Sequence, residues 1–162
     1  MLSSDLTVPN ANSATAPPPL IGALLRMPFE VVRERMLAGL HERGFSDLVA
    51  AHLDVFQYPG PENQRPLDLA KHARMSKQAM NYLLGQLEHA GYLVRENDPD
   101  DRRSRWVRLT KRGQAVARTI RATVAEIETE LQVQLGSDRF TQLRDLLVQL
   151  NTCRIDRGAA HS

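Results

Sequence analysis

The sequence predicts a mainly α-helical protein with one β-hairpin, in the α+β class. Over most of the chain, apolar residues recur at intervals of three and four, which is typical of amphipathic helices. Between residues 92 and 110 the pattern changes to two extended runs separated by Asn97-Asp98-Pro99-Asp100-Asp101, a strong turn signal. The chain has 162 residues, of which 42% are hydrophobic and 25% charged, so it has the size and composition of one globular domain.

The N-terminal part is expected to form a disordered arm and two helices. Residues 1–19 are rich in Ser, Ala, Asn and Pro, a composition that buries too little apolar surface to order itself. Helical spacing then runs over residues 20–44, where Pro28 either starts the helix or kinks it and Gly44 stops it. Ser46-Asp47 is a helix N-cap signal, which predicts a second helix that extends to about Phe56.

Two further helices are expected before the hairpin. A short helix fits residues 67–74, after Pro59-Gly60-Pro61 has ended the preceding helix. Ser76 is the N-cap of the next helix, which runs to about Ala90 and stops at Gly91. Four apolar residues at helical spacing should face the core: Met80, Leu83, Leu84 and Leu87.

Two helices are expected after the hairpin. Thr110 caps a long helix that runs to about Gln134, and Gly136-Ser137 separates it from a last helix. The long helix has an apolar seam of Val116, Ile120, Val124, Ile127 and Leu131, and the last helix has a stripe of Phe140, Leu143, Leu146, Leu147 and Leu150. Two short helices followed by a two-stranded ribbon are the outline of a winged helix-turn-helix, here with additional N- and C-terminal helices.

The charge of the chain is unevenly distributed. The formal net charge is +2 and the pI about 9.0. Residues 62–112 hold 11 Lys and Arg against 7 Asp and Glu, a net +4, whereas the remaining residues hold 10 against 12, a net −2. A basic central module is consistent with nucleic-acid binding, although a merely solvated surface would give the same sums.

The helix that begins after Ser76 has the residues of a DNA-reading helix. Its outward face carries Lys77, Gln78, Asn81 and Tyr82, which is polar and nearly uncharged. The second helix of a helix-turn-helix enters the major groove, where Gln and Asn pair with adenine and Lys reaches guanine or a phosphate. Ser76 can cap the helix and also donate to a phosphate. The alternative is a solvated helix face with no ligand.

The hairpin strengthens the DNA-binding interpretation. Arg102, Arg103 and Arg105 lie at its tip or on its return strand, and arginine suits the narrow, electronegative minor groove. Asp101 lies two residues before Arg103 and could hold that guanidinium in a fixed pose. The alternative is a surface turn with incidental ion pairs, each of which contributes little.

The sequence resembles the multiple antibiotic resistance regulator (MarR) family from about residue 44 to residue 113. The resemblance is carried by Leu69-Ala70, Met75-Ser76-Lys77-Gln78-Ala79-Met80, Leu87-Glu88-His89-Ala90-Gly91-Tyr92, Asp98-Pro99-Asp100-Asp101-Arg102-Arg103 and Val107-Arg108-Leu109-Thr110-Lys111-Arg112-Gly113. It implies a homodimeric transcription regulator, usually a repressor, that binds pseudo-palindromic double-stranded DNA. It also implies that Asp101 positions Arg103 for the minor groove. One departure is Asn81-Tyr82, where a small polar and a basic residue are common in the family.

The resemblance suggests a division of the chain into five parts. The expected parts are a disordered arm (1–19), a dimerisation helix (20–44), a winged helix-turn-helix DNA-binding domain (45–112), C-terminal dimerisation helices (113–153) and a flexible tail (154–162). The apolar stripes on the terminal helices exceed what one small winged domain needs, which favours a dimer over an intramolecular helical bundle.

Many members of the family release DNA when a small, often aromatic, ligand enters a crevice between the dimer helices and the winged domain. Met36, Phe45, His52 and Phe56 are candidate lining residues, and each of them could instead be plain core. Cys153 is the one cysteine, so it excludes a disulfide framework and a multi-cysteine zinc site. No metal or cofactor is expected, and His41-Glu42 has no evident partners for a metal site.

Other functions and locations fit the sequence less well. It shows no phosphate-binding glycine loop, paired metal-binding histidines or nucleophile motif, so an enzyme is not expected. A helical dimeric adaptor, with the winged helix used for protein contacts, is the alternative hypothesis. No run of apolar residues is long enough to span a membrane and the N-terminus lacks the pattern of a signal peptide, so a cytoplasmic protein is expected.

Overall fold

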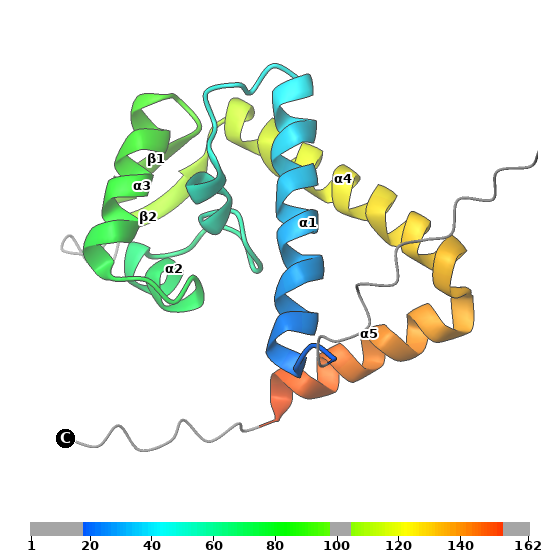
Figure 1. Ribbon diagram of the computed structural model, residues 1–162. Helices are drawn as coiled ribbons and strands as arrows, with labels where there is room; N and C mark the ends of the chain where they lie inside the picture. The colour runs from blue at the N-terminus through cyan, green and yellow to red at the C-terminus, as the bar shows by residue number, and fades with distance from the viewer. Residues whose placement is uncertain (1–17, 98–104, 154–162) are drawn as a thin grey trace, which may run out of the picture.

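The computed structural model describes residues 18–97 and 105–153. Its elements are α1 (Ile21–Glu42), the 3-10 helix η1 (Ala50–Asp54), α2 (Pro66–His72), α3 (Lys77–His89), β1 (Leu93–Asn97), β2 (Arg105–Leu109), α4 (Lys111–Leu135) and α5 (Ser137–Thr152). Helices α2 and α3 and the β1–β2 hairpin gather into one unit, here called the winged unit, and α1, α4 and α5 extend away from it (Figure 1). The mainly helical fold with one hairpin is confirmed.

Helix α1 differs from the sequence expectation at its start and agrees with it at its end. It begins at Ile21, so Pro28 lies inside the helix and does not start it. At the other end Gly44 has a φ of +87°, a conformation that glycine adopts without strain. The Gly44 N–H donates to the carbonyl oxygen of His41 at 3.0 Å, which closes the helix as expected.

The prediction of a helix from Ser46-Asp47 to Phe56 is wrong, because only the short 3-10 helix η1 forms there. The Asp47 carboxylate does not cap a helix. It accepts hydrogen bonds from the Tyr92 hydroxyl at 2.5 Å and from the Arg112 guanidinium at 3.0 Å. Long-range bonds therefore replace the local cap that the sequence signal implied.

Helices α2 and α3 form the predicted pair. Helix α3 starts at its expected cap, where the Ser76 Oγ accepts the N–H of Ala79 at 3.1 Å. All four residues of its predicted stripe are buried: Met80, Leu83, Leu84 and Leu87. The inward face of α3 is thus fixed by packing, which leaves the opposite face to solvent.

The β-sheet contains the predicted hairpin and one further bridge. Strands β1 and β2 pair antiparallel, with Leu93 opposite Leu109. The Val107 N–H also donates to the Gln64 carbonyl at 2.9 Å, and the Asn63 N–H donates to the Val107 carbonyl at 3.0 Å. This bridge joins the segment before α2 to the outer side of β2, and the sequence did not predict it.

Helix α4 connects the winged unit to α1 and α5. The Thr110 Oγ1 accepts the Gly113 N–H at 3.2 Å and caps α4 as predicted. Val116 and Ile120 join the main core, and Ile127 is buried further along the helix. Arg35 of α1 donates two hydrogen bonds to the Glu130 carboxylate of α4, at 2.5 and 2.8 Å. The two helices therefore pack along most of the predicted seam.

The terminal helices carry apolar side chains that the described residues leave uncovered. On α5 only Phe140 is buried. The exposed apolar residues, here called the terminal apolar surface, are Leu20, Ile21, Leu24, Leu25, Met27, Phe29 and Val31 at the start of the chain and Leu143, Leu146, Leu147 and Val148 on α5. An intramolecular bundle would have buried them. No helix within the described ranges is long and apolar enough to cross a membrane.

Gly113 marks the closest approach between α4 and the winged unit. A Cβ atom at this position would lie 1.9 Å from the backbone oxygen of Tyr92 and 2.9 Å from the side chain of Leu109. The backbone atom cannot move aside without displacing the start of β1. A residue without a side chain is therefore required where α4 crosses the winged unit.

We expect Gly113→Ala to lower the free energy of unfolding by about 1–3 kcal/mol or more, because it overpacks a backbone contact. Gly22→Ala is the matched control, since a Cβ there meets nothing within 4 Å. In the first turn of a helix that change should be close to neutral or stabilise by up to about 0.5 kcal/mol. Urea denaturation measures both. Equal stability of the two variants would contradict the close crossing.

Candidate nucleic-acid interface

The outward face of α3 presents the polar residues that the sequence singled out. Lys77, Gln78 and Tyr82 are exposed and Asn81 is half-buried. A Cβ at Gly85 would meet nothing within 4 Å, so the helix is open to solvent at this position as well. Because the Ser76 Oγ accepts the Ala79 N–H, its own hydroxyl hydrogen remains available to donate.

The turn between α2 and α3 adds a cation that the sequence analysis missed. Arg74 has a φ of +53°, at a position where glycine is the usual residue. The turn is closed by the Met75 N–H, which donates to the Ala70 carbonyl at 3.0 Å. Arg74 is exposed, and its side chain has no ion pair within the part of the chain that the structure describes. In the sequence, the signal for this residue was a basic side chain two positions before the Ser76 cap.

The structure describes one of the three arginines predicted on the hairpin. Arg105 is exposed at the start of β2, opposite Asn97. Asp101, Arg102 and Arg103 fall in residues 98–104, outside the described residues, so their roles stay predictions.

An ion pair holds the hairpin against α3. The Glu88 carboxylate of α3 accepts the Arg95 backbone N–H and its Nε, each at 2.9 Å, and also its terminal guanidinium nitrogen. Hydrogen bonds from Arg95 hold the pKa of Glu88 below its ordinary value, against the opposing effect of burial. The base of the wing and the helix before it are therefore held as one unit.

A second polar cluster joins the winged unit to the long helices. Tyr92 is fully buried, and its hydroxyl donates to Asp47 while accepting from Arg112 at 2.8 Å. The Arg112 guanidinium also lies 4.4 Å from the centre of the Tyr92 ring. The hydrogen bond from Tyr92 lowers the pKa of Asp47, and burial raises the pKa of Tyr92. The loop after α1, the start of β1 and the start of α4 meet at this cluster.

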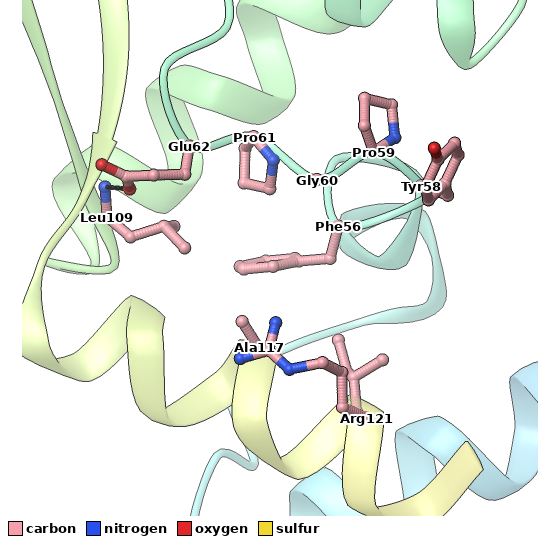
Figure 2. A pocket seen from close by; sticks show the side chains of 10 residues that line it. Phe56, Tyr58, Pro59, Gly60, Pro61, Glu62, Leu109, Ala117 and Arg121 are labelled. Carbon is pink, nitrogen blue, oxygen red and sulfur yellow. Dashed lines mark hydrogen bonds between the residues drawn. The ribbon is translucent and has the colours of Figure 1, made fainter. Parts of the chain in front are cut away.

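A cavity of about 260 Å³ lies between the loop before α2, the end of β2 and α4. Figure 2 shows Phe56 and Pro61 on one side of it and Ala117 of α4 on the other. Its apolar lining consists of Phe56, Tyr58, Pro59, Pro61, Leu109, Ala117 and Ile120. The cavity therefore touches both the winged unit and a long helix.

Two charged residues border this cavity and differ in their bonding. The Glu62 carboxylate accepts the Leu109 N–H at 2.7 Å and is thereby held to the wall (Figure 2). The Arg121 side chain runs back towards Ala117, facing the ring of Phe56 (Figure 2). Among the described residues Arg121 has no hydrogen-bond or ion-pair partner. The cavity thus combines apolar walls with one uncompensated cation.

Of the four residues predicted to line a ligand crevice, only Phe56 borders this cavity. Met36 and Phe45 are half-buried and pack against the main core. His52 is buried on η1, where its ring bonds to the Val49 N–H and to Gln86. The loop residues Pro59 and Pro61 and the α4 residue Arg121 were missed, because nothing in the local sequence shows that these segments meet.

Other chemistry finds little support in the described part of the chain. No group of three or more His, Cys, Asp or Glu side chains there is placed to hold a metal ion. Cys153 is exposed and follows the last residue of α5.

Comparisons with known proteins agree with the geometry. Residues 60–104 match the model of the MarR family. The HTH-type transcriptional repressor Rv2887 of Mycobacterium tuberculosis is 29% identical over 82% of this chain and 94% of its own length.

Solved structures give the same result. The structure of the M. tuberculosis MarR family protein Rv2887 in complex with salicylic acid is similar, with a TM-score of 0.58, 28% identity, and coverage of 85% of this chain and 98% of that one. Streptococcus pneumoniae FabT in complex with DNA has a TM-score of 0.69 and 19% identity over 82% of this chain and 93% of that one, a likeness of fold.

Proposed function

Because the chain belongs to the MarR family, we propose that it is a sequence-specific DNA-binding transcription regulator that acts as a homodimer. The observation that carries the proposal is the exposed polar face of α3 beside a hairpin that begins its return strand with an exposed arginine. In this proposal residues 45–112 bind DNA, and residues 20–44 and 113–153 form the dimer. The mycobacterial relative is named a repressor, and we extend repression of a pseudo-palindromic operator to this chain.

The polar face suits the chemistry of the major groove. Gln78 and Asn81 can each pair with an adenine through two hydrogen bonds, and Lys77 can reach guanine or a phosphate. Two residues are placed to contact phosphates: Ser76 at the N-terminus of α3 and Arg74 in the turn before it. In this arrangement Arg105 acts with Arg102 and Arg103 in the adjacent minor groove, and Asp101 orients Arg103.

Selection of bound duplexes from random DNA tests this proposal. We expect the full chain to select two half-sites related by a dyad, about one helical turn apart. Gln78→Ala should relax the preference at one base pair by about 1–3 kcal/mol, because it removes a paired base contact. Arg74→Gln should weaken all sequences alike and lower the salt slope by about one.

Arg139→Ala is the control for these variants, since it removes an exposed cation from α5. It should leave operator binding unchanged. If the wild-type chain selects no sequence, the proposal is wrong and the adaptor hypothesis is favoured. If Gln78→Ala and Arg74→Gln both bind like wild type, α3 is not the reading surface.

The homodimer is proposed from the terminal apolar surface. Leu146 is 62% exposed and Leu24 is 51% exposed, so the described residues leave both side chains largely uncovered. A second copy would cover both helices at once in a symmetric interface, where the same patch is used twice. Burying such a surface is the ordinary reason for obligate association.

We expect Leu146→Lys to shift the chain from dimer to monomer at micromolar concentration, because a charge would enter the apolar interface. Val94→Lys is the matched control, since Val94 is 41% exposed on β1 in the winged unit. Analytical ultracentrifugation measures the mass of each variant. A Leu146→Lys chain that remains as dimeric as the control would contradict this interface.

The cavity beside α4 is proposed as the effector site, and its chemistry suits a small aromatic carboxylate. The Phe56 and Ile120 side chains offer apolar walls, and the Arg121 guanidinium, which has no partner among the described residues, offers a cation for the carboxylate. The salicylic acid complex of the mycobacterial relative supports this class of ligand. A ligand at this position releases DNA if it binds better to the conformation that cannot bind DNA.

Salicylate serves as the probe for the effector site. We expect Arg121→Met to weaken salicylate binding by about tenfold, since a charge-assisted hydrogen bond contributes about 1.5–3 kcal/mol. Arg118→Met, an exposed residue of the same helix that does not line the cavity, should bind like wild type. Calorimetry measures the affinity and fluorescence anisotropy the release of DNA. Equal affinity of both variants would place the effector elsewhere.

A further inference from the structure

A chain of three hydrogen bonds runs from the buried η1 turn to the exposed face of α3. The Val49 backbone N–H donates to the Nδ1 atom of His52 at 3.2 Å. The Nε2 atom of His52 lies 3.0 Å from the Oε1 atom of Gln86, and the Nε2 atom of Gln86 donates to the Tyr82 hydroxyl at 3.1 Å. His52 is 8% exposed and Tyr82 67% exposed, so the chain connects the core to the surface.

The first bond of this chain decides the direction of the others. Because Nδ1 of His52 accepts a backbone N–H, the hydrogen of the neutral ring resides on Nε2. That nitrogen then donates to the Oε1 atom of Gln86, which turns the amide so that its NH2 group faces Tyr82. The Tyr82 oxygen accepts from Gln86, and its own hydroxyl hydrogen is left to donate outward.

We propose that His52 and Gln86 are positioning residues that hold Tyr82 as a hydrogen-bond donor towards DNA. The inference rests on the proposed function, because it gives one residue of the α3 face a defined role. A donor selects an acceptor atom, which in the major groove is a purine N7, guanine O6 or thymine O4. A phosphate oxygen is an acceptor of the same chemistry. The cytosine amino group, itself a donor, is disfavoured opposite Tyr82.

The arrangement also reduces the freedom of an exposed side chain. Tyr82 and Gln86 are one helical turn apart on α3, so a bond between them alone would exchange readily with water. His52 is held by the η1 backbone and is shielded from solvent, and it therefore gives the pair a fixed partner. Side chains that are ordered before binding lose less entropy on binding.

The test compares Tyr82→Phe, Gln86→Met and the double variant of the full chain, by anisotropy on the operator selected by wild type and on a scrambled duplex. Each single change should weaken operator binding by about three- to tenfold, as expected for one hydrogen bond. The double variant should lose no more than the larger single loss, because Gln86 acts only through the Tyr82 hydroxyl.

The two duplexes distinguish the two acceptors. If Tyr82 contacts a base, Tyr82→Phe weakens the operator and leaves the scrambled duplex unchanged. If it contacts a phosphate, the variant weakens both duplexes equally. The proposal is overturned if Tyr82→Phe binds both duplexes like wild type, if Gln86→Met does so, or if the two losses multiply in the double variant.

Two substitutions of His52 distinguish a role in positioning Gln86 from a purely structural role. In His52→Gln the amide NH2 group can take the place of Nε2 and donate to Gln86, so operator binding should be retained. In His52→Asn the shorter amide can still accept the Val49 N–H but does not reach Gln86, so binding should fall as in Gln86→Met. If the two variants lose binding only in proportion to their stability, measured by urea denaturation, His52 has a structural role and the proposal is wrong.

A measurement without DNA separates this inference from the proposed function. The ring nitrogen shifts of His52 in the free protein should show hydrogen on Nε2, and hydrogen on Nδ1 would overturn the network even if the chain binds an operator. A wild-type chain that selects no DNA would overturn the proposed function and, with it, the role of Tyr82. A chain that selects DNA while Gln86→Met behaves like wild type overturns the inference alone.

Discussion

The position of the winged unit depends on the way the chain is held at Tyr92. Its backbone oxygen accepts the Thr110 N–H at 3.1 Å and lies against Gly113, where no side chain would fit. Its hydroxyl, on the other side, bonds to Asp47 and Arg112. One buried residue thus ties the start of β1 to α4 and to the loop after α1. A rotation of α4 must therefore be transmitted to the hairpin, and through Glu88 and Arg95 to α3.

The cavity beside this junction touches the segments that such a rotation would move. Leu109 in its wall immediately precedes the Thr110 cap of α4, and its backbone N–H is bonded to Glu62. The loop that carries Pro61 and Glu62 continues into the bridge between Gln64 and Val107 of β2. An occupant of the cavity would press on α4 and on the outer side of the sheet at once. A continuous set of contacts therefore runs from the cavity to the sheet and to α4.

The parts of the fold that sequence predicts well are those where local and long-range interactions agree. In α3 a cap at Ser76 and four buried apolar residues specify the same helix, and it forms between the expected ends. At Asp47 they disagree, because the carboxylate bonds to Tyr92, 45 residues away in sequence. The bond between His52 and Gln86 and the position of Pro61 across the cavity from Ala117 are likewise absent from any local pattern. The α3 side chains could therefore be named in advance, and the groups that orient or adjoin them could not.

On the candidate surface, charged and neutral residues suit two different tasks, which are attraction to phosphates and recognition of bases. Three of its described cations are Arg74 before the helix, Lys77 at the start of the α3 face and Arg105 on the hairpin, and in the proposed function they meet phosphates and the edges of the grooves. Arg74 keeps a left-handed conformation that glycine would adopt more easily, which costs free energy and leaves a cation in place. Gln78, Asn81 and Tyr82, on the face itself, are neutral groups whose hydrogen bonds are directional. Since phosphate contacts set register and base contacts set sequence preference, an oriented donor at Tyr82 that meets a base would add specificity without adding attraction to every duplex.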